Sequence, residues 1–202
     1  METSQPEQKK QAVIEAALTA FGRGGYKKTS VSDIAGAAGI SKAMVFHYFG
    51  SKKELYLHLA RFCGETLSSG IKKGFDSVSD DFFDRIVTAS EIKISVLKKH
   101  PGLMSFTESL YRETDAEVSG EMRKIMLREG EAFKTRNIFE GMDCSKFKEG
   151  IDPKLVLKLM VYFSEGCVNN APRGESLDVD SIMSEFHECV ALMKNNFYRE
   201  EL

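Results

Sequence analysis

The helical spacing of apolar residues along almost the whole chain is the feature that most restricts its fold. Strand-like alternation of apolar and polar residues is hard to find, and Pro and Gly are rare inside the long segments. In the first segment, one apolar stripe with the period of an α-helix consists of Ala12, Val13, Ala16, Ala17, Ala20 and Phe21. The sequence therefore predicts an all-α protein.

Breaker residues divide this pattern into a small N-terminal unit and a larger helical bundle. Gly22-Arg-Gly-Gly predicts the end of the first helix, and His100-Pro101-Gly102 predicts the end of a later one. We expect short helices at 31–38 and from residue 41 to Gly50. The longer helices are expected at 51–74, 80–99, 103–112, 116–141, 153–171 and 178–199.

Composition and motifs narrow the classes of protein that the chain can represent. No apolar run is long enough to cross a bilayer, and the polar start METSQPEQKK differs from a signal peptide, so we expect a cytoplasmic protein without membrane association. The four cysteines form no CxxC pair, and the histidines lack ligand spacing. With no GxSxG, P-loop or GxGxxG pattern, we expect no enzymatic activity, no cofactor and no metal.

Charge is distributed unevenly along the chain. Residues 1–61 hold 9 Lys and Arg against 5 Asp and Glu, whereas the remainder holds 19 against 25. A basic N-terminal third on an acidic body favours a polyanion partner at one end of the molecule.

The segment from Val31 to Phe49 has the pattern of a helix-turn-helix. Ala35 is small where two helices must cross closely, and Gly39 tolerates the positive φ of a tight turn. The apolar residues expected to hold the second helix against the first are Ile34, Ala38, Ile40 and Val45. We expect Tyr48 and Phe49 mainly to pack. Similar turns are common in helical proteins, so this pattern leaves DNA reading and plain helix packing both open.

The remaining face of the second helix has the chemistry to read DNA. It carries Lys42, Ala43, Met44, Phe46 and His47. Such a helix fits the major groove, where Lys42 can reach a guanine or a phosphate and Ala43 and Met44 can touch a thymine methyl. Ser32 can reach a neighbouring base or phosphate. Lys52, in the first turn of the next helix, is placed for a phosphate contact.

The residues from Ala17 to Leu55 resemble a known family. The run A-x-x-x-F-G-x-x-G-Y-x-x-T-S-V-x-D-I-A-x-x-A-G-I-S-K-x-x-V-F-H-Y-F-x-S-K-x-E-L is similar to the N-terminal domain of the TetR/AcrR transcriptional regulators. The resemblance implies an all-helical homodimer in which the last two helices pair between subunits. It implies a helix-turn-helix DNA-binding domain at residues 1–52 and a ligand-binding and dimerisation domain at residues 53–202.

The resemblance also assigns the DNA contacts by position. Ser30 and Ser32 match DNA-contacting positions on the supporting helix, and Lys52 matches the phosphate-contacting lysine. The positions that match the reading helix are Lys42, Ala43, Met44, Phe46 and His47. Phe46 stands where many members carry Tyr, so the hydroxyl that would bond a phosphate is missing.

The last two predicted helices are apolar over wide arcs. One arc can bury against the monomer, and the excess suits a four-helix interface with a second copy, although a central position in the monomer is the alternative. A dimer has a physical advantage, because two reading helices spaced by about 34–36 Å roughly add their free energies on a palindromic operator.

The middle of the chain favours a deformable apolar cavity. The chain has 14 Phe, 9 Met and no Trp, and such side chains adapt to variable shapes, although an ordinary core explains most of them. The predicted contacts to a small hydrophobic effector are Phe82, Ile86, Phe106, Leu110, Tyr111, Met126, Phe133 and Phe163.

These features together predict a ligand-responsive transcriptional regulator, foremost a repressor released from its operator by a lipophilic molecule. By the resemblance, ligand would tilt the helix that starts at Ser51 and move the two reading helices apart. Two alternatives remain: a helical adaptor or lipid-binding bundle that reads no DNA, and an activator or ligand-independent regulator.

Overall fold

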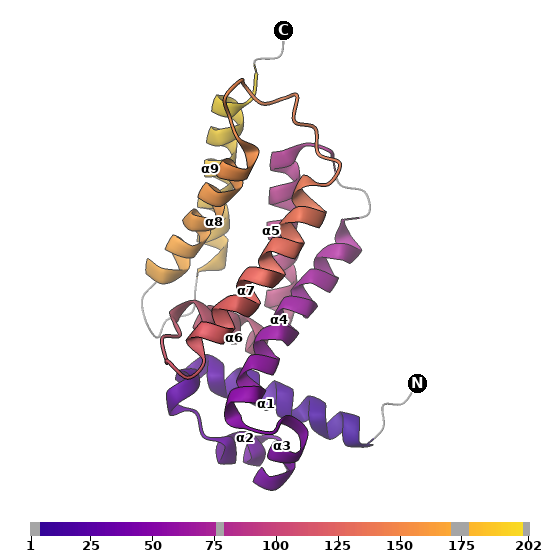
Figure 1. Cartoon of the computed structure of the whole chain (residues 1–202), viewed down its shortest axis with the longest axis vertical. Helices are drawn as coiled ribbons and strands as arrows, with labels where there is room; N and C mark the ends of the chain where they lie inside the picture. The colour runs from indigo at the N-terminus through magenta and orange to yellow at the C-terminus, as the bar shows by residue number, and fades with distance from the viewer. Residues whose placement is uncertain (1–4, 76–78, 171–177, 200–202) are drawn as a thin grey trace. The chain divides into compact units, whose positions relative to one another are not determined.

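The computed structural model describes residues 5–75, 79–170 and 178–199, and the all-α prediction is confirmed for them (Figure 1). The regular elements are α1 (Gln5–Lys28), α2 (Val31–Ala37), α3 (Lys42–Phe49), α4 (Lys52–Gly74), α5 (Phe82–Lys99), α6 (Pro101–Arg112), α7 (Ser119–Phe133), the π-helical η1 (Lys134–Phe139), α8 (Pro153–Asn170) and α9 (Val179–Phe197). Within these ranges, no helix has the length and apolar character needed to cross a membrane.

The first helix does not end at Gly22, as the glycine run predicted, but continues to Lys28. Gly22 lies inside α1 because α6 passes close to it: a Cβ built on Gly22 would lie 2.9 Å from the backbone N of Phe106. The break in helical geometry comes at Gly25, with φ 65° and ψ −177°. The run therefore serves two purposes, a close helix–helix approach and then a change of chain direction.

Two other helix boundaries differ from the prediction. α6 begins at Pro101, within the predicted breaker, because proline fits the first turn of a helix, where its missing N–H is not needed. α7 ends at Phe133 and passes into the π-helical η1, so the expected single helix over 116–141 is wrong in its bounds and its regularity.

The chain forms two compact units. The first contains Met1–Ser69 and Ser95–Glu131, and the second contains Gly70–Ile94 and Ala132–Leu202. The functional boundary between residues 52 and 53 stays a prediction.

The core of the first unit is an aromatic cluster from three helices. Tyr56 of α4 meets Phe21 and Tyr26 of α1 and Phe106 of α6, with ring centroids 5.1, 5.3 and 5.2 Å apart. All four side chains are at most 3% exposed. Edge-to-face aromatic contacts of this kind fix orientation as well as distance, so the cluster holds α1, α4 and α6 in one arrangement.

The core of the second unit centres on Phe82, Phe83 and Phe147. The ring of Phe147 lies 5.3 Å from that of Phe82 and 4.9 Å from that of Tyr198, centroid to centroid. Beside it, the buried Asp81 carboxylate lies 3.3 Å from the Nζ atoms of both Lys146 and Lys194. A buried carboxylate needs such partners, and this one ties the start of α5 to α9.

Candidate nucleic-acid interface

Two serine caps and a glycine turn build the predicted helix-turn-helix. Ser30 begins α2 by accepting the Ser32 N–H (3.1 Å), and Ser41 begins α3 by accepting the Met44 N–H (3.3 Å). Gly39, at φ 67°, makes the turn between them. Ala35 is 3% exposed. The helix-turn-helix geometry that Ala35 and Gly39 predicted is therefore confirmed.

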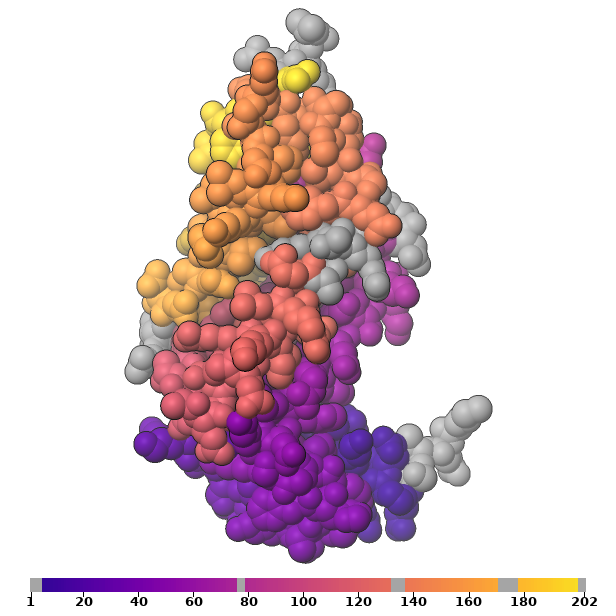
Figure 2. All heavy atoms as spheres, viewed as in Figure 1, coloured from indigo at the N-terminus to yellow at the C-terminus, as the bar shows by residue number. Residues whose placement is uncertain are grey.

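One face of α3 packs and the opposite face is open to solvent. Val45 and Phe49 are buried, and Tyr48 is half-buried. Of the predicted reading residues, Lys42, Ala43 and His47 are exposed, Phe46 is 38% exposed and Met44 is half-buried. In Figure 2 the purple atoms of this part of the chain lie open to the viewer. With 8 residues, α3 makes about two turns, enough to place one face in a groove.

The side chains on this face differ in how they are held. The Lys42 Nζ lies 5.8 Å from the centre of the Phe46 ring, so the two outward side chains contact each other. Ser32 is exposed at the start of α2. Ser30 is half-buried, and its hydroxyl is already engaged as the cap of α2, so a DNA contact would share that oxygen with the Ser32 N–H.

Lys52 is held by the end of α1. Its Nζ lies 4.5 Å from the centre of the Tyr26 ring and donates to the Lys27 carbonyl oxygen at 3.4 Å. The Ser51 hydroxyl caps α4 at the Glu54 N–H. An ammonium and the N-terminus of α4 thus occur together, a combination that suits a phosphate. Sequence reasoning missed the role of Tyr26, because nothing in local spacing shows a contact between residues 26 positions apart.

The neighbouring Lys53 is differently placed. Its Nζ lies 2.6 Å from Glu121 Oε1 on α7, and this hydrogen bond raises the pKa of Lys53. Because its charge is already paired within the protein, Lys53 offers a matched contrast to Lys52.

The predicted effector contacts are divided between the two units. Phe106, Leu110, Tyr111 and Met126 belong to the first unit, and Phe82, Ile86 and Phe163 belong to the second. Among them, Phe82, Ile86, Phe106 and Leu110 are buried, while Tyr111, Met126 and Phe163 are half-buried. The side chain of Phe133 lies outside the described residues. The effector set stays a prediction.

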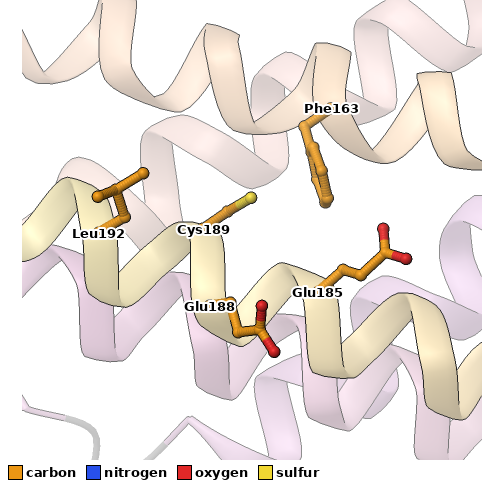
Figure 3. A pocket seen from close by; sticks show the side chains of 5 residues that line it. All are labelled: Phe163, Glu185, Glu188, Cys189 and Leu192. Carbon is orange, nitrogen blue, oxygen red and sulfur yellow. The ribbon is translucent and has the colours of Figure 1, made fainter.

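A hollow of about 370 Å³ lies between α8 and α9 in the second unit. It is lined by Phe163, Glu185, Glu188, Cys189 and Leu192, and Figure 3 shows Phe163 and Cys189 facing it from the two helices. Of the predicted effector contacts it contains Phe163.

Large apolar side chains are exposed on the same two helices. On α8, Leu155 is 56%, Leu159 44% and Tyr162 56% exposed, and on α9 Leu192 is 65% exposed. Positions 155, 159 and 162 have the spacing of one helical face. Exposed apolar faces of this kind are typical of protein–protein contacts.

The N-terminal part of the chain is similar to known bacterial regulators. Residues 13–59 match the family described as bacterial regulatory proteins, tetR family. The HTH-type transcriptional regulator BetI of Agrobacterium fabrum is 43% identical over 53 residues, so the matched part of the chain spans about a quarter (26%) of that relative.

Two longer matches extend the likeness beyond α4. The fatty acid metabolism regulator protein of Bacillus subtilis is 25% identical over 73% of this chain and 75% of its own length. The structure of the fatty acid degradation regulator FadR from Bacillus halodurans has a TM-score of 0.73 at 18% identity, covering 92% of this chain and 97% of that chain. The structural match shows the same fold.

Proposed function

Because the chain belongs to the tetR family of bacterial regulatory proteins, we propose that it is a ligand-responsive transcriptional regulator, foremost a repressor of a palindromic operator. The observation that carries the proposal is the open face of α3, formed by Lys42, Ala43, Met44, Phe46 and His47 on a helix whose other face is locked into the protein. The proposed activity is binding, without a catalytic step.

The proposed DNA contacts divide into base reading and phosphate binding. The start of α3 enters the major groove, where Lys42 reaches a guanine or a phosphate and Ala43 and Met44 touch thymine methyl groups. Ser32 and Ser30 flank this helix at the start of α2. Lys52 and the N-terminus of α4 bind a phosphate and fix the register on the duplex.

The proposed assembly is a homodimer through α8 and α9. The exposed side chains of Leu155, Leu159, Tyr162 and Leu192 support it, because a second copy would remove them from water. Two copies bring two reading helices to one operator, and an inverted repeat is the sequence that matches a two-fold axis.

The proposed effector is a small lipophilic molecule bound by the apolar side chains of residues 53–202. One relative is named a fatty acid metabolism regulator and shares 25% identity over most of its length, which makes a fatty acid the first probe. A ligand shifts the operator equilibrium only by its difference in affinity for the DNA-bound and free forms.

Selection of duplexes from random DNA by the full chain tests the proposal. We expect selection to enrich an inverted repeat. The wild type should bind this duplex, and the Lys42→Glu and Lys52→Glu variants should not. Lys53→Glu is the matched control, because Lys53 is paired with Glu121. No enriched sequence, or equal binding by all three variants, contradicts DNA reading. Unchanged operator affinity at saturating palmitate contradicts the fatty-acid class of effector alone.

A further inference from the structure

Tyr26 is held by the segment that follows α6. Its backbone N–H donates to Glu113 Oε2 at 2.8 Å. Burial first, and then the Glu117 carboxylate, raise the pKa of the Tyr26 hydroxyl. The second oxygen of Glu113 accepts the Asp115 N–H at 2.8 Å, so the carboxylate is itself fixed by the turn in which it lies.

The same tyrosine supports the phosphate-facing lysine. The Lys52 Nζ lies 4.5 Å from the centre of the Tyr26 ring, in the range of a cation–π contact. The Tyr26 ring also packs in the aromatic cluster, with its centroid 5.3 Å from that of Tyr56. Lys52 therefore contacts a ring whose position is restricted by its packing.

The backbone at Tyr26 needs an external partner. Gly25 has left helical geometry, so the N–H of the next residue is not supplied with an ordinary helical acceptor. Thr29 closes the following turn by donating to the Gly25 carbonyl oxygen at 2.7 Å. Glu113, 87 positions away in sequence, supplies the acceptor for Tyr26.

We propose that Glu113 is a positioning residue for operator binding, which fixes Tyr26 and through it the Lys52 ammonium at the DNA surface. The inference rests on the proposed DNA-binding function. Glu113 touches no DNA itself. It follows α6, which lies directly against α1 at Gly22 and at Gly102, where an added Cβ would be 3.3 Å from Thr19 Oγ1. The residue that follows α6 thereby determines where the Lys52 ammonium lies and how well it contacts the phosphate.

A double-mutant cycle in operator affinity tests this inference. The probe is the duplex selected by the full-length wild type, titrated from about 50 to about 200 mM salt with wild type, Glu113→Ala, Lys52→Ala and the double variant. We expect both single variants to weaken binding by a similar factor, about tenfold, and to reduce the salt slope by about 0.9 per subunit. The double variant should bind within about twofold of Lys52→Ala.

Two further variants separate positioning from folding. Glu108→Ala removes a carboxylate within α6 that interacts electrostatically with Arg112, and should keep the wild-type salt slope. Glu113→Gln keeps one carbonyl oxygen for the Tyr26 N–H, and should recover part of the affinity and of the slope. It replaces Glu113→Ala in the cycle if the alanine variant does not fold.

The outcomes are distinct. The positioning role is overturned if the double variant loses operator affinity by the product of the two single-variant factors. It is also overturned if a folded Glu113 variant keeps the wild-type salt slope. Both outcomes leave DNA binding in place. A wild-type chain that binds no duplex defeats the proposed function itself.

Discussion

Replacement of Gly22 by alanine tests the close packing of α1 against α6. In the structure α6 crosses α1 at this glycine. A Cβ there would lie 2.5 Å from Ser105 Oγ, and 2.9 Å from both the carbonyl carbon of Ser105 and the backbone N of Phe106. The hydroxyl can rotate away, but the two backbone atoms can move only with α6. We therefore expect Gly22→Ala to push the two helices apart.

The size of the effect follows from two opposing contributions. Alanine in a helix interior gains about 1 kcal/mol over glycine through backbone entropy. Overpacking of a well-filled contact costs about 1–3 kcal/mol, and a clash with two backbone atoms belongs at the upper end of that range. The net loss is about 1–2 kcal/mol, which for a chain of this length lowers the melting temperature by about 2–8 °C.

Urea and thermal unfolding followed by circular dichroism measure this loss. Gly130→Ala is the matched control, because Gly130 lies in α7 and its added Cβ meets nothing within 4 Å. The control should gain up to about 1 kcal/mol from the same change of residue. If Gly22→Ala is as stable as the wild type, or stabilised like the control, the close approach of α6 to α1 is refuted.

Four other expectations follow from particular contacts. Lys42→Glu should lower operator affinity by at least about tenfold in a filter-binding titration while leaving the circular dichroism spectrum unchanged, because Lys42 is exposed on the face of α3 that we propose enters the groove. Ser41→Ala removes the cap of an eight-residue helix and should destabilise α3 by about 1 kcal/mol, seen as faster amide exchange there. A Leu159→Glu, Leu192→Glu double variant should sediment as a monomer at concentrations where the wild type is a dimer; a dimeric variant would place the interface elsewhere. Burial acts to raise the pKa of Asp81, but the Asp84 N–H and two lysine ammonium groups outweigh burial and lower that pKa. The stability that the Asp81 carboxylate provides above pH about 4 should therefore be lost as acid protonates it. Asp81→Asn should show a smaller loss of stability on acidification than the wild type.

Local chemistry made the helix-turn-helix predictable. The small Ala35 and the positive-φ Gly39 act on neighbouring residues, so their spacing in sequence reports their geometry in space. The exposed face of α3 could be predicted from helical spacing as well. The buried Val45 fixes the rotation of the helix, and the residues opposite it are left exposed.

The contacts that cross long sequence distances were not predictable in this way. Gly22 lies under α6, and its role depends on where a helix that starts 79 residues later is placed. The contacts of Tyr26 with Glu113 and Lys52 likewise depend on how segments distant in sequence are placed. The π-helical η1 escaped prediction because periodicity does not distinguish one extra residue per turn in a short stretch.

The predicted effector contacts show most clearly what sequence alone does not resolve. Phe106 and Phe82 satisfy the same pattern of size and hydrophobicity, yet they belong to the cores of different units. An apolar side chain that fills a core and one that lines a cavity are identical in composition, so only a ligand-bound measurement separates them.

Photo-cross-linking from α3 is the most direct test of the central claim that this helix enters the groove. A photoreactive amino acid is placed at Ala43, on the open face, and in a second variant at Leu127, which is 65% exposed on α7. Each full-length variant is irradiated with the duplex selected by the wild type. The account predicts cross-links from position 43 to bases in both half-sites and none from position 127. Strong binding with no base cross-links from position 43 would contradict it.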